Sequence, residues 1–519
     1  MAISSNNKRI AKNTAMLYIR MMALMVVSIL TAGVALRVLG EVDYGINNVV
    51  GGIVVTFGWI SSMISSAMGR YFAVEMGRGD DKKLNQYFCL SILGFVFISI
   101  IVVILAETLG LWFLNNKMTI PPERMIAAHW VFQMSVLSFI FKLMSSPYIA
   151  IIVNRERMNV YAWISILEVV LRLGYLYLLI IVPMDKLIFC AIFGALSLFF
   201  VSLIYVVYAL IQFKECKYHF YWDKENFMEM ASYSGWSIFG AFSGIARNQG
   251  INILLNMFFN PVVNAARGIA FHINNALDQF VTNFSMAARP QIIKYYGAGE
   301  RDSMLRLVYR TSLLCYYLMW MMSLPVLLET PFILKIWLKN VPENTVLFTR
   351  LVLLTSLIET ISFPIMAAVS ATGKIKYYQV VTGGLLILNL PVAYIFLKLG
   401  GPPEVTMYIA IVIAVLSQIS RILFMKQLHG MSLSDYSFKV LFRLSIVTMV
   451  SCVLPIIVCR IMPIGWTRLF VVTVESTIII LITAFAIGID SGDRRAIVDV
   501  TKHKFNQNRL VNIIKRYKS

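Results

Sequence analysis

Long apolar runs, separated by short polar or Pro- and Gly-containing segments, recur along the whole chain. Each run is about as long as the 20 residues that a helix needs to cross the bilayer. The pattern therefore predicts an all-α, polytopic membrane protein with about 14 transmembrane helices. The expected spans, good to about three residues at each end, are 14–38, 45–68, 87–109, 126–151, 159–181, 187–212, 231–257, 262–287, 305–327, 346–370, 377–397, 405–425, 441–461 and 466–488.

Composition supports the membrane prediction and excludes several other classes. The 519 residues are 59% hydrophobic and 14% charged, with a mean hydropathy of +0.75, whereas about a quarter of the residues of a soluble domain are charged. The net charge of +20 does not indicate a nucleic-acid partner, because no aromatic residues alternate with the basic runs as stacking requires. The six cysteines form no CxxC pair, so we expect no metal, cofactor or disulfide framework.

Lys and Arg residues lie mainly on one side of the predicted membrane. Thirty fall in segments on the N-terminal side, nine on the opposite side and seven within the spans. Because positively charged loops are retained in the cytoplasm, this distribution predicts that both termini are cytoplasmic. The regular alternation also requires an even number of spans, in agreement with fourteen.

The two halves of the chain resemble each other at a nearly constant spacing. Pro147 and Pro364 lie 217 positions apart, and Arg70 and Arg289 lie 219 apart. These matches indicate two six-helix lobes in a parallel pseudo-repeat, an arrangement that builds transporters around a central site. We expect the paired prolines to be hinges, because proline interrupts helical hydrogen bonding. The predicted units are an N-lobe (1–213), a C-lobe (214–430), a C-terminal helix pair (431–488) and a basic cytoplasmic tail on the membrane surface (489–519).

Polar and charged residues gather on the predicted helices at 231–257 and 262–287. A charge near the bilayer centre costs roughly 2.5–3.5 kcal/mol on insertion scales, so each is expected to face protein or a water-filled cavity. Interhelical hydrogen bonds alone contribute only about 0.6 kcal/mol each. We therefore interpret the cluster as the lining of a functional cavity. Its members are Arg247, Asn248, Arg267, His272, Asn274, Asn275 and Asp278.

The residue types in this cluster favour an anionic amphiphile. Arg267, Phe271, Asn274 and Asp278 follow the 4-3-4 spacing of one helical face. Arginine binds phosphate through a planar, bidentate fork and stays charged, and amides suit the hydroxyl groups of sugars.

Several ionisable residues are candidates for coupling transport to an ion gradient. Glu168 and Arg172 are spaced i, i+4, so they form either a mutually neutralising pair or a proton or cation site linked to Lys142. His272 is a rival because the pKa of histidine is near neutral. Asp278 is the remaining candidate.

The sequence contains no motif of a catalytic or nucleotide-binding site. The longest predicted connections have fewer than twenty residues, which is too short for an extramembrane domain. These connections are 69–86, 110–125, 213–230 and 288–304. We therefore expect a protein that is not an enzyme.

Several segments resemble the polysaccharide-transporter branch (Wzx-like oligosaccharide flippases) of the multidrug/oligosaccharidyl-lipid/polysaccharide (MOP) exporter superfamily. The resemblance covers most of the chain, thins after residue 430 and is specific for the family rather than for a substrate. The segments are NKRIAKNTAMLYIRMM (7–22), LGEVDYGINNVVGGIV (39–54), FAVEMGRGD (72–80), NQGINILLNMFFNPVVNAARGIA (248–270), PQIIKYYGAGE (290–300) and ATGKIKYYQVV (371–381).

This resemblance implies a flippase in the bacterial inner membrane that works by alternating access coupled to H⁺ or Na⁺. The implied substrate is an undecaprenyl-pyrophosphate-linked oligosaccharide for O-antigen, capsule or exopolysaccharide assembly, with membrane lipid and polysaccharide-assembly proteins as partners. It also implies that Arg20, Arg247 and Arg267 contact the pyrophosphate.

Three alternatives to this flippase stay open. They are a multidrug or cation antiporter of the same superfamily, a lipid II flippase, and a membrane-embedded polysaccharide polymerase or glycosyltransferase. The expected positive charge of the cavity disfavours the antiporter, and the short connections disfavour the enzyme.

Overall fold

A computed structural model describes residues 2–55, 58–116, 118, 120–259, 261–338, 341–490, 492, 494 and 495. These residues are almost entirely helical and include no strand. The helices are α1 (Ala2–Val55), α2 (Gly58–Arg78), α3 (Asp81–Leu105), α4 (Leu111–Asn116), α5 (Met125–Asn154), α6 (Met158–Leu178), α7 (Lys186–Gln212), α8 (Lys224–Phe258), α9 (Pro261–Gly297), α10 (Arg301–Leu338), α11 (Thr345–Thr360), α12 (Ser362–Ala371), α13 (Lys376–Lys398), α14 (Val405–His429), α15 (Leu433–Tyr436), α16 (Arg443–Ile461) and α17 (Trp466–Thr483).

Short irregular turns join some of these helices into longer ones. A π-helical turn at Ala106–Gly110 makes α3 and α4 continuous, and another at Ser437–Phe442 joins α15 to α16. Conversely, α1 changes direction at Gly40, whose φ is 79°. With α1 counted as one helix, and with α3–α4, α11–α12 and α15–α16 each counted as one, the described residues form fourteen long helices, which confirms the predicted architecture.

Ten of the fourteen are long and apolar enough to span a membrane by composition alone, as far as the described residues extend. Helices α8 and α9 are among the other four. Their low hydropathy reflects the polar cluster that the sequence places on them, and it indicates that these two helices face something other than lipid along part of their length.

The connections between helices are shorter than predicted. The expected loops at 69–86 and 288–304 are wrong, because α2 continues to Arg78 and α9 continues to Gly297. Each is followed by a tight turn at Gly79 or Gly299, with φ of 74° and 77°. The apolar pattern ends before the helices do, since their polar ends extend beyond the apolar belt.

The two halves repeat each other in their turns as well as in their helices. Glu156 and Gly373 both have positive φ, 58° and 75°, and they lie 217 positions apart, the same spacing as the paired prolines. A left-handed residue is uncommon outside glycine. Its recurrence at this position supports the duplication independently of sequence matches.

The two candidate hinge prolines differ in their surroundings. The break between α11 and α12 lies just before Pro364. Proline has no N–H to donate to the Thr360 carbonyl four residues earlier, which accounts for the break. Pro147 lies inside α5, which continues without a break. The hinge role of both stays a prediction.

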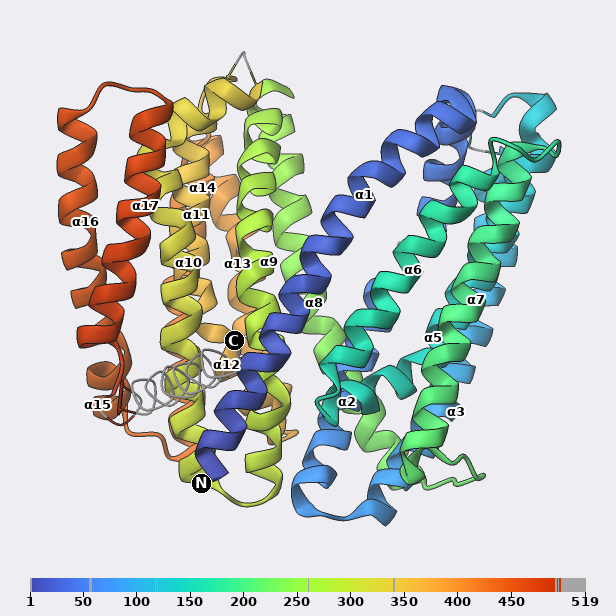
Figure 1. Ribbon diagram of the computed structural model, residues 1–519, viewed down its shortest axis with the longest axis horizontal. Helices are drawn as coiled ribbons and strands as arrows, with labels where there is room; N and C mark the ends of the chain where they lie inside the picture. Colours follow the sequence, from blue (N-terminus) through green and yellow to red (C-terminus); the bar gives the residue numbers. More distant parts are fainter. Residues whose placement is uncertain are drawn as a thin grey trace, which may run out of the picture.

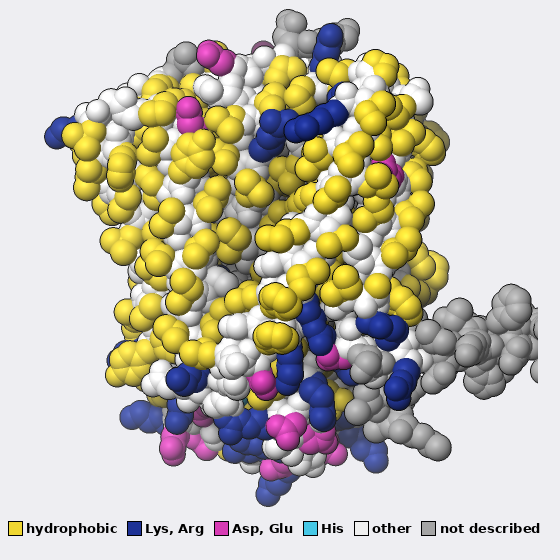
Figure 2. Space-filling view, turned by 90° about the vertical axis from the view of Figure 1, so that its left-hand side faces the viewer, with side chains coloured by type: hydrophobic (Ala, Val, Ile, Leu, Met, Phe, Trp, Pro, Cys, Tyr) yellow, Lys and Arg dark blue, Asp and Glu magenta, His cyan; other side chains and the backbone are white. Residues whose placement is uncertain are grey.

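The fourteen helices form two bundles that lie close together at the end carrying the N-terminus and diverge toward the other end (Figure 1). We name these the inner and outer ends. The N-lobe contains α1 to α7 and the C-lobe α8 to α14, with the α16–α17 pair beside α10. On the face shown in Figure 2, apolar side chains form a belt, and charged side chains gather at its inner end. The lobe boundaries at 213 and 430 stay predictions, and residues 496–519 of the predicted tail lie outside the described residues.

A buried ion pair fastens the C-terminal helix pair to the C-lobe. Glu329 is completely buried at a kink in α10 between two prolines. Arg468 at the start of α17 donates from Nη2 to Oε2 of this carboxylate at 2.9 Å, and its Nε lies 2.7 Å from Oε1 as part of the ion pair. A carboxylate without this arginine would have no compensating charge.

Replacing this arginine is therefore expected to weaken the attachment of the helix pair. Arg468→Ala leaves the Glu329 carboxylate buried and unpaired, which costs about 3–5 kcal/mol. We expect a lower unfolding temperature in detergent, and recovery of most of the loss in the double variant Glu329→Leu/Arg468→Leu. An unchanged unfolding temperature in Arg468→Ala would show that the pair does not hold this attachment.

Candidate functional site

The polar cluster predicted on α8 and α9 lines a single cavity of about 590 Å³. Its described lining comes entirely from the C-lobe, mainly from α8 and α9, with a third wall from α11 and α12. The lining residues are Arg247, Asn248, Gln249, Asn252, Arg267, Gly268, Phe271, His272, Asn274, Asn275, Asp278, Ser356, Glu359 and Phe363.

The structure thus brings together every cluster residue that the sequence singled out on these two helices. The helical-face argument explains why: Arg267, Phe271, Asn274 and Asp278 share one side of α9, and all four line the cavity. The described side chains that line the cavity belong to the C-lobe alone.

Arg247 is paired within the cavity. Its Nη1 lies 2.9 Å from Oε1 of Glu359 on α11, and the two side chains are 15% and 32% exposed. Glu359 was not predicted as a cavity residue, because no helical spacing relates it to the cluster on α8 and α9. An isolated carboxylate in the apolar segment 346–370 was the available signal, although its arginine lies more than 100 positions away.

Arg267 is held differently. The side chain is 5% exposed, and its Nη1 donates to the Asn252 side-chain oxygen. Its guanidinium carbon lies 4.3 Å from the centre of the Phe271 ring, and its Nε has no hydrogen-bond partner. Within the described part of the chain, Arg267 has no carboxylate partner, so a buried positive charge faces the cavity with only an amide and an aromatic ring beside it.

The charge of the lining therefore differs from the sequence prediction. The two arginines are matched by Asp278 and Glu359, so the described lining has a formal charge of zero with His272 neutral. The prediction of a net positive charge is wrong for the described lining, because it did not include Glu359. The charges are nevertheless separated: Asp278 lies eleven residues beyond Arg267 on α9, about 16 Å along the helix axis.

Arg20 lies outside this lining. Its guanidinium carbon is 4.6 Å from the ring centre of Tyr161 on α6, within the N-lobe. The neighbouring Tyr18 donates to the Phe280 carbonyl of α9 at 3.1 Å, so α1 contacts the helix that carries Arg267. The assignment of Arg20 to the pyrophosphate stays a prediction.

The coupling candidates are also separated by the structure. Asp278 and His272 line the cavity, whereas Glu168, Arg172 and Lys142 do not. Among the described residues Glu168 and Arg172 form no ion pair, so of their two alternatives the neutralising pair is not formed: Arg172 lies instead beside Tyr175 of the same helix. Lys142 is exposed on α5.

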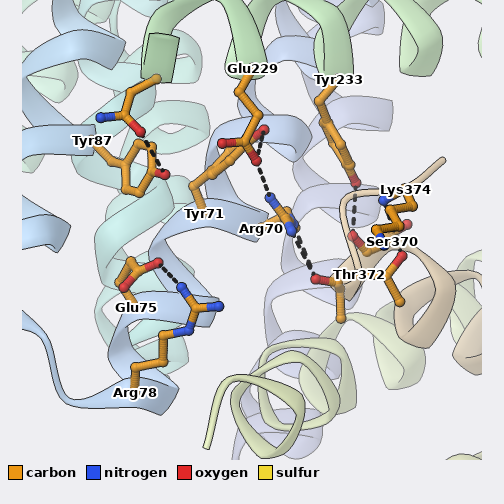
Figure 3. A network of polar contacts seen from close by, with 12 residues as sticks. Arg70, Tyr71, Glu75, Arg78, Tyr87, Glu229, Tyr233, Ser370, Thr372 and Lys374 are labelled. Atoms are coloured by element: carbon orange, nitrogen blue, oxygen red, sulfur yellow. Dashed lines mark hydrogen bonds and ion pairs between the residues drawn. The ribbon is translucent and has the colours of Figure 1, made fainter. Parts of the chain in front are cut away.

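Contacts between the lobes close the inner end (Figure 3). Arg70 of α2 donates from Nε and Nη2 to the Ala371 carbonyl at the end of α12, at 3.2 and 3.0 Å. It also approaches Glu229 of α8 to 3.8 Å. Beside these contacts, within the C-lobe, the hydroxyl of Tyr233 on α8 lies 3.5 Å from the Ser370 carbonyl of α12.

The duplicated half makes the reciprocal contact. Lys294 of α9 reaches Glu156, in the turn after α5, at 2.9 Å, and Gln291 donates to the same carboxylate oxygen. Each lobe therefore contacts the end of the fourth helix of the other lobe: α2 contacts the end of α12, and α9 contacts the turn after α5.

Two glycines allow α2 and α9 to approach this closely. A Cβ added to Gly77 would lie 2.2 Å from the Lys294 carbonyl oxygen, and one added to Gly297 would lie 2.3 Å from the Val74 carbonyl oxygen. Because both obstacles are backbone atoms, no side-chain rotation relieves them. The inner closure thus depends on the absence of side chains at the crossing.

Comparison with known proteins identifies the fold. No family model and no curated protein matches the sequence. The structure resembles an outward-facing multidrug-resistance MATE family transporter of the MOP superfamily, with a TM-score of 0.69 and 11% identity over 82% of this chain and 96% of that one. A MOP superfamily transporter from Pyrococcus furiosus, described as having a binding pocket of reversed polarity, gives 0.65 and 12% over 82% and 97%. A Vibrio cholerae MATE transporter gives 0.62 and 15% over 83% and 98%. At these identities the likeness establishes the fold alone.

Proposed function

We propose that this chain, which has the fold of the MATE transporters, is a flippase for a pyrophosphate-linked oligosaccharide on a polyprenyl lipid. The observation that carries the proposal is Arg267, a buried positive charge that faces a cavity of about 590 Å³ and has no carboxylate partner among the described residues. An anionic headgroup supplies that partner. The amides around it, on Asn248, Asn274 and Asn275, suit sugar hydroxyls.

Transfer of a pyrophosphate and its sugars through lipid without such a cavity is prohibitive, because charged and polar groups lose their hydration. The arginine forks replace water at the phosphate oxygens. The polyprenyl tail stays in the bilayer, which already solvates it. Repeated opening and closing of the inner contacts then exposes the headgroup to each side in turn.

Glu359 has a defined role in this proposal: it is the internal counter-ion of Arg247. Its carboxylate takes the position on Arg247 that a phosphate oxygen would take. An incoming headgroup therefore has to displace it, and the cavity stays electrically balanced when the headgroup leaves.

Removing this competing charge is expected to strengthen anion binding. Glu359→Gln keeps the shape of the side chain but frees Arg247, so the dissociation constant for inorganic pyrophosphate should fall by about tenfold, equivalent to about 1.4 kcal/mol. Isothermal titration calorimetry on purified protein measures it. Glu107→Gln, the same charge change at an exposed position outside the cavity, is the matched control and should bind as the wild type does. Weaker binding by Glu359→Gln would contradict the counter-ion role.

A multidrug or cation antiporter is the second candidate, and two observations favour it. The cavity carries two carboxylates, Asp278 and Glu359, and several of the solved structures with this fold are MATE transporters, one described as a multidrug-resistance protein. A cationic substrate would have to lie toward Asp278, away from both arginines. The two candidates differ in the sign of the substrate charge, which makes them separable by experiment.

The remaining parts of the proposal concern the surroundings of the protein. We propose that the chain spans the bacterial inner membrane with both termini in the cytoplasm, so that the inner closure faces the cytoplasm. Coupling to H⁺ or Na⁺ is proposed to act on Asp278, the candidate that lines the cavity. Polysaccharide-assembly proteins are the proposed partners, and no enzymatic activity is proposed.

A further inference from the structure

A small recess of about 50 Å³ adjoins the cavity. The two share Arg247, Arg267 and five other lining residues, so a molecule held by the arginines reaches the recess directly. Beyond the shared wall, the recess is bounded by α13 and α14, which contribute Asn389, Thr406, Met407 and Ala410.

Asn389 is the unusual residue of this recess. Its side chain is completely buried, yet in the part of the chain that the structure describes neither its Oδ1 nor its Nδ2 has a hydrogen-bond partner. Leaving both the donor and the acceptor of a buried amide without hydrogen-bond partners destabilises the fold, and such groups are rare in native proteins. A residue of this kind is explained by a ligand or water that occupies the space before it.

Packing of α8 against α13 holds Asn389 in this position. A Cβ added to Gly250 of α8 would lie 2.4 Å from Cδ2 of Leu390, the residue next to Asn389. The close approach removes solvent from this side of α13. The unpaired amide therefore belongs to the recess rather than to a loosely packed surface.

Outside the wall shared with the cavity, the recess combines the Asn389 amide with apolar groups and with two threonines, Thr355 and Thr406, whose hydroxyls already donate to backbone carbonyls of their own helices or turns. Ile251, Val352, Met407 and Ala410 surround the amide donor and acceptor of Asn389. At about 10–15 Å³ for each water-sized group, the volume accepts a substituent of a few non-hydrogen atoms. A secondary amide that carries a methyl group fits this volume. Its carbonyl and N–H pair with the asparagine, and its methyl group contacts the apolar wall.

We infer that this recess binds the acetamido group of the sugar that is attached to the pyrophosphate. The inference rests on the proposed function and deepens it. In a 2-acetamido sugar the amide is on the carbon next to the phosphorylated one, so phosphate and amide enter the site as neighbours. Arg247 and Arg267 lie in the wall common to cavity and recess, which matches this adjacency. Asn389 then selects substrates whose first sugar is N-acetylated.

The test compares two lipids in proteoliposomes that contain the full-length protein. One carries N-acetylglucosamine on polyprenyl pyrophosphate, and the other carries glucose, which has a hydroxyl in place of the acetamido group. Wild-type protein is expected to translocate the acetamido lipid at least tenfold faster at low substrate concentration. Asn389→Leu, of similar volume without the amide, should lose this preference. The unfolding temperature of the purified variant in detergent shows that it is folded.

The outcomes distinguish this inference from the proposed function. Equal rates for both lipids with wild-type protein overturn the acetamido site and leave the flippase proposal standing. A preference that persists in Asn389→Leu also overturns it, since recognition then lies elsewhere. Failure to translocate either lipid removes the proposed function and the inference with it.

Discussion

Arg267→Gln is expected to abolish translocation of a pyrophosphate-linked lipid. The substitution keeps hydrogen-bonding capacity but removes the one cavity charge that no described carboxylate balances. Hydrogen bonds to charged groups contribute about 1.5–3 kcal/mol each, so the loss corresponds to a decrease of about tenfold to more than a hundredfold in affinity. Arg267→Lys keeps the charge without the bidentate fork and should retain part of the activity.

Translocation in proteoliposomes measures this effect, with binding of inorganic pyrophosphate as a second readout. Arg460→Gln is the matched control, because it removes the same charge from an exposed position at the outer end of α16. It should behave as the wild type does in both assays. Normal translocation by a folded Arg267→Gln protein would remove this residue from the headgroup site.

Gly77→Ala is expected to prevent closure of the inner end and so to stop transport. A single methyl group at this position would lie 2.2 Å from the Lys294 carbonyl oxygen, which forces α2 and α9 apart. The separation also disrupts the contacts that Lys294 makes with Glu156. Because overlap with backbone cannot be relieved by a rotamer change, even this small substitution has a large effect.

Hydrogen exchange followed by mass spectrometry is the direct readout of this separation. Amides in the segments 70–80 and 290–299 should exchange faster in Gly77→Ala than in the wild type. Gly174→Ala on α6 is the matched control, since an added Cβ there meets nothing within 4 Å. Unchanged exchange together with normal transport in Gly77→Ala would show that the crossing is not required for the transport cycle.

The architecture and half of the cavity could be predicted from sequence because both depend on local patterns. Apolar length defined the spans, and helical periodicity placed Arg267, Asn274 and Asp278 on one face. Glu359 and Asn389 could not be assigned in this way. They contribute to the site only through packing of α11 and α13 against α8 and α9, and no periodicity links residues on helices so far apart in the chain.

The helix ends illustrate a different limit. Residues 69–78 and 288–297 have a mixed polar pattern that favours a loop beside a membrane, yet both are helical. Packing around Gly77 and Gly297 stabilises them against each other. Likewise, the total charge of the cavity depended on a single acidic residue that forms its ion pair across two helices. Tertiary contacts decided both points.

The most direct test of the central claim compares two substrates in the same proteoliposomes. One is a polyprenyl-pyrophosphate-linked sugar, whose arrival in the opposite leaflet is followed with a membrane-impermeant modifying enzyme. The other is a fluorescent organic cation, followed with and without H⁺ and Na⁺ gradients. We predict that the lipid-linked sugar is translocated, dependent on Arg267, and that the cation is not transported. Gradient-driven transport of the cation, with no movement of the lipid-linked sugar, would contradict the account.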